Sequence, residues 1–486
     1  MNAPSNESQF LLSRRKFLER NAMGLGSVAL AWLLAQDRAL ARGKFQKAKR
    51  FDLVPKTPIA PARAKAMISL FQHGGPSHID LFDPKPTLSR LHGKEYSGNV
   101  HFSFVNRASK RLFGSPWKFS RHGDCGTPVS ELLPHTAKIV DKIAVLRSMH
   151  TGANGHEVSI RYFHGGIPGV LGRPHFASWL TYGLGAETDS LPAYMVLRDP
   201  GGHPVDGVNN WSNGFLPSLY QGTVLRPKEP RIANLDAPPH LRGPVQRRNL
   251  DFLRELNERH AKAFPAEADL EARIASYELA AAMQTSAREA LDISGESEAT
   301  KKLYGIDRAV TRDYGTRCLI ARRLVERGVR FVQLFHSNQP WDNHSTIQST
   351  LPSICAKTDQ PSAALVLDLE QRGLLDSTIV HWGGEIGRLP VTENHGGDTK
   401  KMGRDHNGQG FTIWLAGGGI RGGMAYGETD DVGHRAVVDR VTPNDYQATL
   451  LHLFGLNHRE LVFEHGGQKH IITAGRESRV VHDILL

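Results

Sequence analysis

Short, almost wholly apolar runs alternate with longer segments of helical periodicity along most of this 486-residue chain. A short apolar run without polar alternation is typical of a strand that is buried on both faces. Strands that alternate with helices form a mostly parallel sheet with helices on both faces. The sequence therefore predicts an α/β fold with a mostly parallel central sheet, in a single large domain over residues 64–486.

The expected elements follow from these runs and from the glycines that end them. Strands are predicted over residues 66–72, 142–149, 193–197, 330–335, 378–382 and 411–416. Helices are predicted over residues 132–140, 176–182, 313–327, 361–372 and 444–454. Charged and apolar residues recur at helical spacing over 246–295, which predicts a helical insertion near 246–300. Residues 86–130 and 205–241 predict long loops.

The first 41 residues have the features of a signal peptide. Residues 13–18 (SRRKFL) form a twin-arginine signature, residues 22–35 are mildly apolar, and residues 39–41 (ALA) form a cleavage site. The apolar run is short for a membrane crossing, so we expect cleavage and no stable transmembrane anchor; an uncleaved anchor is the alternative. The mature chain would begin with a basic, Pro-containing arm over 42–63. The twin-arginine translocase is then a partner during export, and a periplasmic or extracellular location is predicted.

The net charge limits which binding partners are expected, and the cysteine content limits which kinds of scaffold are possible. The formal net charge is +11, and the leader holds five basic and three acidic side chains, so its removal leaves +9. The basic residues are scattered and form no long stripe with interleaved aromatics, so nucleic acid is not an expected partner. Anionic substrates or acidic envelope polymers suit this charge better, and a solvated basic surface with no specific partner is the favoured alternative. The three cysteines are widely spaced, which excludes a disulfide scaffold and a cysteine-based zinc finger.

Aspartate and histidine occur together directly after several apolar runs. The segments are residues 73–80 (HGGPSHID), 341–344 (WDNH) and 403–407 (GRDHN). Carboxylates and imidazoles are ligands of divalent metals. In an α/β sheet, strand ends are where ligands from distant parts of the chain converge. Three such segments in one chain therefore predict a metal site.

These residues also have structural interpretations. Asp342 and His344 would lie on the same face of a strand, or would bind one ion together from a loop. A salt-bridged or exposed loop pair is the alternative. Asp405 and His406 are either metal ligands or a helix N-cap followed by a surface histidine. Arg388, with Glu385 near the end of a predicted strand, either holds an anionic oxygen through its N–H donors or forms a buried ion pair.

With their neighbours, these segments resemble a known family. Residues 73–80 continue as LFDPKP, and 382–388 (WGGEIGR), 403–407 and 414–423 (WLAGGGIRGG) follow. From about residue 64 to the C-terminus the chain resembles the DUF1501 family of exported bacterial proteins, in the form common among planctomycetes. That family is grouped with the alkaline phosphatase and sulfatase superfamily. The resemblance implies metal-dependent hydrolysis of a phosphate or sulfate ester, with an anionic small molecule or polysaccharide ester as substrate.

The resemblance also implies a set of metal ligands for as many as two divalent ions, with Zn, Mg, Ca and Mn not distinguished. Two Asp–His pairs resemble the two sets of metal ligands of the superfamily, and a histidine near the C-terminus resembles the final ligand. The segment 73–80 is ambiguous: its aspartate is the preferred ligand and its two histidines are further candidates. These ligands are Asp342 with His344, Asp405 with His406, His434, and Asp80 with His73 and His78 as further candidates.

The nucleophile that the resemblance implies is less defined, because the sulfatase signature C-x-P-S-R is absent. Strand 142–149 runs into residues 150–156 (HTGANGH), a position similar to the nucleophile turn of the superfamily. Thr151 is the first candidate nucleophile and Ser77 its rival, while His156 either ligates or donates a proton. Thr151 as an ordinary turn hydroxyl, and a site that uses metal-activated water, remain open. The alternative for the whole chain is a catalytically inactive envelope binding or scaffold protein that keeps the fold.

Overall fold

A mixed eight-stranded sheet forms the centre of the protein. The computed structural model describes residues 51–103, 108–233, 235, 238–263, 268–393 and 398–486. The predicted leader, 1–41, and residues 42–50 of the predicted arm lie outside the described residues. The strands, in their order across the sheet, are β12 (Met424–Tyr426), β4 (Ile143–Met149), β11 (Phe411–Ala416), β8 (Thr378–Gly383), β1 (Ala66–Phe71), β7 (Phe331–Leu334), β5 (Tyr194–Leu197) and β6 (Thr223–Leu225).

The directions of the strands determine which strand ends lie at the same edge of the sheet. β1 pairs in parallel with β7 and β8, and β5 pairs in parallel with β7 and β6. β11 pairs antiparallel with β8 and β4, and β12 is parallel to β4. β11 therefore runs opposite to the other strands, and its amino end lies at the edge where their carboxyl ends lie. The prediction of a mostly parallel sheet is confirmed.

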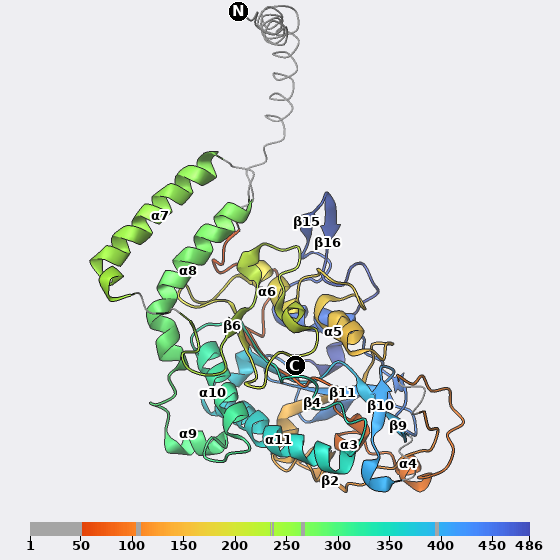
Figure 1. The fold of residues 1–486 in the computed structure, drawn as a ribbon. Helices are drawn as coiled ribbons and strands as arrows, with labels where there is room; N and C mark the ends of the chain where they lie inside the picture. The colour runs from red at the N-terminus through yellow and green to blue at the C-terminus, as the bar shows by residue number, and fades with distance from the viewer. Residues whose placement is uncertain (1–50, 104–107, 234, 236–237, 264–267, 394–397) are drawn as a thin grey trace, which may run out of the picture.

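Helices cover both faces of the sheet, as predicted. The principal helices are α5 (His156–Gly165), α6 (Phe176–Leu184), α10 (Arg312–Glu326), α11 (Ile347–Gln371) and α12 (Pro443–Leu453). Alternate residues of β1 enter different cores: Ile68 packs in the core that holds Leu319 of α10, whereas Met67 packs in the core that holds Trp179 of α6. This alternation buries a strand on both sides. Figure 1 shows α10 and α11 on one side of the sheet and α5 and α6 on the other.

Shorter and peripheral elements complete the described chain. The remaining helices are α3 (His78–Leu81), α4 (Pro86–Arg90), α7 (Pro244–Ala263), α8 (Ala268–Leu291) and α9 (Glu298–Leu303). Two-stranded ribbons are formed by β2 (Phe119–His122) with β3 (Thr127–Ser130), β9 (Gly387–Thr392) with β10 (Arg404–Asn407), β13 (Glu428–Thr429) with β14 (Ala436–Val438), and β15 (Phe463–His465) with β16 (Gln468–His470). The long helices α7 and α8 lie in the segment predicted to be helical and extend away from the sheet in Figure 1. No helix among the described residues is both long and apolar enough to cross a membrane.

Some predicted elements differ from those observed. The helix expected from Pro361 begins at Ile347 and has Pro352 and Pro361 in its interior. Proline lacks the N–H of a helix interior and favours the first turn, but burial of α11 against the core keeps this helix continuous. The segment 132–140 forms a 3₁₀ helix over Thr136–Lys142 instead of an α-helix. The ribbon β9–β10 was not predicted, because β10 (RDHN) is polar although it is buried.

Buried histidines in the core on the α6 side link stability to pH. His381 of β8 lies beside Ser69 Oγ at 3.0 Å, and His175 lies beside His164 at 3.0 Å between the ring nitrogens. Burial lowers the pKa of His175 and of His381 to about 3, from an ordinary value of 6.5. The unfolded chain therefore binds protons at these rings at a higher pH than the folded chain does.

We expect the free energy of unfolding to fall as the pH decreases from about 6.5 toward 3, because the unfolded state binds more protons over that range. His381→Gln should make this fall less steep, which urea unfolding at a series of pH values would measure. His240→Gln, which changes an exposed histidine, should leave the slope as it is. A slope that is equally steep in His381→Gln would contradict a neutral buried ring at this position.

Candidate functional site

Four chain segments bring five residues together at the carboxyl edge of the sheet. His156 follows β4 and begins α5, Asp342 and His344 follow β7, and Glu385 follows β8. His406 lies in β10, shortly before the amino end of β11. Because β11 is the reversed strand, its amino end brings His406 to the same edge as the other four. This edge is where open α/β sheets bind ligands.

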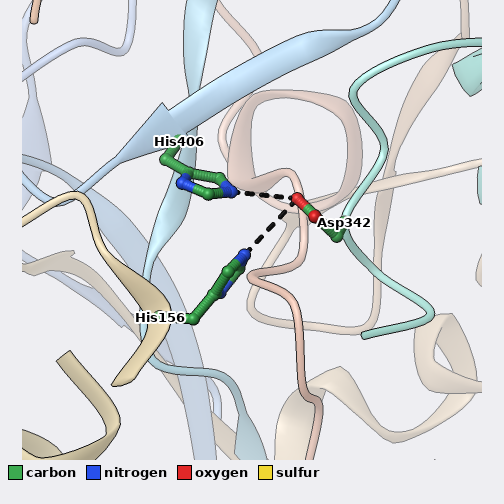
Figure 2. A group of neighbouring side chains, drawn as sticks. All are labelled: His156, Asp342 and His406. Atoms are coloured by element: carbon green, nitrogen blue, oxygen red, sulfur yellow. Dashed lines mark hydrogen bonds and ion pairs between the residues drawn. The ribbon is translucent and has the colours of Figure 1, made fainter. Parts of the chain in front are cut away.

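Three imidazoles converge on one carboxylate oxygen. Asp342 Oδ1 lies 3.0 Å from His344 Nε2, 3.1 Å from His406 Nε2 and 3.5 Å from His156 Nε2. The Nε2 atoms of His344 and His406 are 2.9 Å apart. Figure 2 shows the rings of His156 and His406 pointing toward the Asp342 carboxylate. We name His156, Asp342, His344 and His406 the histidine–aspartate centre.

The spacing of these atoms fits a divalent ion. Zinc–nitrogen and zinc–oxygen bonds of about 2.0–2.2 Å place tetrahedral ligands about 3.3–3.6 Å from one another. Four of the six separations between the donor atoms of the centre run from 2.9 to 3.5 Å, at or slightly below these values. His156, Asp342 and His406 form one group with metal-ligand spacing, and His344, Asp405 and His406 form an overlapping one. Imidazole nitrogen and carboxylate oxygen are both suitable donors.

Burial and charge act against each other in the centre. Burial would raise the pKa of Asp342, but Arg388 and the three imidazoles hold it far below its ordinary value. Burial would lower the pKa of His156, but the carboxylates of Asp342 and Glu385 raise it to about 9. Burial lowers the pKa of His406 to about 4. The centre therefore holds a largely buried carboxylate whose negative charge is matched by the groups around it.

Oxygen atoms contact the opposite side of each imidazole. His156 Nδ1 lies 2.6 Å from Glu385 Oε1, and His406 Nδ1 lies 3.0 Å from Ser103 Oγ. His344 Nδ1 contacts a carboxylate oxygen of Glu393. The Nε2 atoms thus face the centre, while the Nδ1 atoms face these oxygens.

Asp405 lies behind the histidines. Its Oδ1 accepts the His406 backbone N–H at 2.7 Å, and its Oδ2 accepts the Ser103 N–H at 2.7 Å. Its Oδ1 is also 3.8 Å from His344 Nδ1. The predicted N-cap alternative for Asp405 and His406 is wrong, because both residues lie in strand β10.

Arg388 supports the centre instead of facing a substrate. Its side chain is fully buried and donates to the carbonyl oxygens of Gly75 at 3.0 Å and Arg404 at 3.2 Å. Its Nη2 also donates to the Gly74 carbonyl and to Asp342 Oδ1, the latter at 2.5 Å. The guanidinium is thus committed to the protein, and its ion pair is with Asp342. The structure contradicts the prediction that Arg388 is available to hold a substrate oxygen.

Asp80 and Ser77 do not join the centre. Arg404 donates to both carboxylate oxygens of Asp80, at 2.7 and 3.0 Å, and both side chains are fully buried. Ser77 Oγ donates to Asp80 at 2.5 Å. A buried carboxylate paired in this bidentate way is already neutralised. The structure therefore argues against Asp80 as a metal ligand and Ser77 as a nucleophile.

Three predicted histidine ligands also lie apart from the centre. His73 packs against Phe71, with 4.6 Å between ring centroids. His78 Nε2 lies 2.7 Å from the Gly433 carbonyl. His434 Nδ1 lies 3.2 Å from the hydroxyl of Tyr96. None of the three belongs to a group with metal-ligand spacing among the described residues.

Thr151 is placed as a turn hydroxyl. Its Oγ1 donates to the Ala153 carbonyl at 3.0 Å and lies 3.2 Å from Ser159 Oγ in α5. These bonds connect the turn after β4 to the helix that begins at His156. The position of His156 in the centre is therefore stabilised by this turn, and the geometry gives Thr151 this structural role.

Glu393 and Ser103 were missed from the sequence, and Glu385 was noted only beside Arg388, near the end of a predicted strand. Glu393 directly follows β9. The ribbon of β9 and β10 was not predicted, because the sequence of β10 is polar. Ser103 lies in a segment predicted to be loop. No local pattern marks either residue, because each is defined by a histidine far away in the sequence.

Comparisons with known proteins give one family. The model of the family described as "Protein of unknown function (DUF1501)" matches residues 64–485. No curated protein matches the chain.

Several solved structures are similar to this chain in shape. They include a crystal structure of Ps i-CgsB in complex with k-i-k-neocarrahexaose, at 10% identity and a TM-score of 0.35, covering 82% of this chain and 72% of that one. The lipoteichoic acid synthase LtaP from Listeria monocytogenes is 7% identical, with a TM-score of 0.34 and coverage of 86% and 78%. The PsFucS1 sulfatase from Pseudoalteromonas sp. is 12% identical, with a TM-score of 0.34 and coverage of 81% and 68%. Residue roles are not transferable at these similarities.

Replacing Arg388 tests its structural role. Arg388→Met leaves Asp342 and three carbonyl oxygens without their donor, so we expect a loss of about 3–5 kcal/mol in the free energy of unfolding. Arg388→Lys should lose less, because it retains the charge. Urea unfolding of the metal-free protein measures both values. Unchanged stability in Arg388→Met would restore the interpretation of a free, substrate-binding guanidinium.

Proposed function

The chain belongs to the DUF1501 family, and we propose that it is a metal-dependent hydrolase of phosphate or sulfate esters. The observation that carries this proposal is the convergence of three imidazole nitrogens on Asp342 Oδ1, within 3.5 Å. The centre lies at the carboxyl edge of the sheet, where a substrate reaches residues of several strands. The Asp342 side chain is 18% exposed, which leaves the centre accessible from solvent.

A divalent ion held by Asp342, His156, His344 and His406 would supply Lewis acidity at an ester oxygen and activate water. Arg388 orients the Asp342 carboxylate through their ion pair. The turn after β4 sets the position of His156. These residues hold the donor atoms in place before substrate arrives, so little rearrangement is needed during the reaction.

The geometry favours hydrolysis without a covalent protein nucleophile. Thr151 Oγ1 bonds within its own turn and to α5, and Ser77 Oγ bonds to Asp80. Among the alternatives that the sequence left open, direct attack by activated water therefore agrees best with these contacts. The expected substrate is an anionic ester, either a small molecule or a polysaccharide.

Export remains part of this proposal. It rests on the twin-arginine signature and cleavage site in residues 1–41, which lie outside the described residues. The twin-arginine translocase exports folded proteins, a route suited to an enzyme that acquires its metal before export. A periplasmic or extracellular location and the planctomycete form of the family stay predictions.

Metal content and ester hydrolysis test the proposal together. We expect purified protein to contain a divalent metal and to hydrolyse an aryl phosphate or an aryl sulfate. Asp342→Asn should lower turnover by more than about 100-fold and reduce metal content, because it removes the carboxylate shared by the three imidazoles. His434→Gln should retain metal and turnover, because His434 lies outside the centre.

The alternative function predicts a different result. Correctly folded wild-type protein that binds no metal and hydrolyses neither ester would favour an envelope binding or scaffold protein. Loss of metal in His434→Gln, with Asp342→Asn unaffected, would place the metal site elsewhere and contradict the proposal.

A further inference from the structure

Each imidazole of the histidine–aspartate centre has an oxygen partner on the side away from Asp342. Glu385 contacts His156, Glu393 contacts His344, and Ser103 contacts His406, in each case at Nδ1. The three partners come from different segments: Glu385 follows β8, Glu393 follows β9, and Ser103 lies in the loop between α4 and β2. Three separate segments thus make the same kind of contact.

The two glutamates determine which nitrogen of each ring is unprotonated and can offer its lone pair to the centre. An ionised carboxylate only accepts hydrogen bonds, so it favours the tautomer in which Nδ1 carries the proton. The Nε2 atom of the same neutral ring is then an unprotonated donor for a metal. His156 and His344 are therefore oriented with Nε2 toward the centre by Glu385 and Glu393.

Both glutamates are themselves held firmly. The Glu385 side chain is fully buried, and its Oε1 accepts the Gly74 N–H at 3.1 Å. The Glu393 side chain is 1% exposed. Its backbone N–H donates to the Gly403 carbonyl at 3.3 Å, next to β10. Because these carboxylates do not swing into solvent, they fix the rings that they contact.

We infer that Glu385 and Glu393 are positioning residues that make the centre a nitrogen-rich site selective for a zinc-class ion over magnesium and calcium. This inference rests on the proposed function, and it names the class of ion that the proposed function left open. Magnesium and calcium prefer six or more oxygen ligands. The centre instead offers three imidazole nitrogens within 3.5 Å of one carboxylate oxygen, and imidazole nitrogen is a preferred ligand of zinc.

The same contacts indicate one ion per chain. A second ion would use the group of His344, Asp405 and His406. The Asp405 oxygens already accept the backbone N–H groups of His406 and Ser103, and His344 Nδ1 already contacts Glu393. Asp405 is thus engaged as a structural acceptor behind the first site.

Metal binding by the full chain tests the inference without any substrate. The protein is stripped with a chelator, and binding of Zn²⁺ alone is measured by equilibrium dialysis with elemental analysis. We expect one Zn²⁺ per chain, retained in the presence of excess Mg²⁺ or Ca²⁺. Co²⁺ bound in its place should show the visible absorption of a four- or five-coordinate site, which is stronger than that of a six-coordinate one.

Variants of the glutamates test the positioning role. Glu393→Gln and Glu385→Gln should each weaken Zn²⁺ binding about 10–100-fold and reduce this Co²⁺ absorption. Glu393→Asp should recover part of the affinity, because it restores a carboxylate. Glu298→Gln is the matched control, since that side chain is 89% exposed in α9, and it should bind Zn²⁺ as the wild type does. Circular dichroism of the metal-free variants verifies folding.

The outcomes separate this inference from the proposed function. Unchanged Zn²⁺ affinity in both folded glutamine variants, or displacement of Zn²⁺ by equal concentrations of Ca²⁺ or Mg²⁺, would overturn the inference. The wild-type competition gives this answer even if a variant does not fold. Selective Zn²⁺ binding with no ester hydrolysis would contradict the proposed function alone, and hydrolysis supported only by Ca²⁺ or Mg²⁺ would contradict the inference alone.

Discussion

A carboxylate removed from water has to be matched by positive charge or by hydrogen-bond donors, and Asp342 is the carboxylate on which this site depends. Its Oδ1 receives Arg388 at 2.5 Å and is surrounded by three imidazole nitrogens. Arg388 in turn donates to the carbonyls of Gly74 and Gly75, in the turn after β1. The charge of Asp342 therefore links the loop after β7 to the turn after β1, and the site is part of the packing of the sheet edge.

The direction of the strands explains how such distant residues meet. β4, β7 and β8 end at one edge, and only a strand of opposite direction could deliver a residue there from its amino end. β11 is that strand, and the ribbon that precedes it carries His406. A fully parallel arrangement would place the segment before β11 at the opposite edge, away from Asp342. The single reversal in an otherwise parallel sheet is thus a requirement of the site.

The sequence predicted the parts of this structure that are determined locally. β1, β8 and β11 are apolar runs, and burial on both faces leaves such runs few alternatives. Asp342, His344 and His406 were predicted because carboxylates and imidazoles follow these runs, and His156 because it follows β4. Asp80 satisfied the same pattern, but the pattern does not show that Arg404, one residue before Asp405, would neutralise it. Glu393 was missed because its role depends on a contact with His344 in another segment. Local patterns locate candidate donors, whereas tertiary pairing decides which donors are already engaged.

The central claim is that His156, His344, His406 and Asp342 bind one ion together. X-ray absorption spectroscopy of the zinc-loaded protein tests this claim most directly, because it reports the number, type and distance of the ligand atoms. The account predicts four to five nitrogen and oxygen ligands at about 2.0–2.2 Å, the fifth being water, with the outer-shell scattering of about three imidazoles. A shell of six oxygens without imidazole scattering would contradict it.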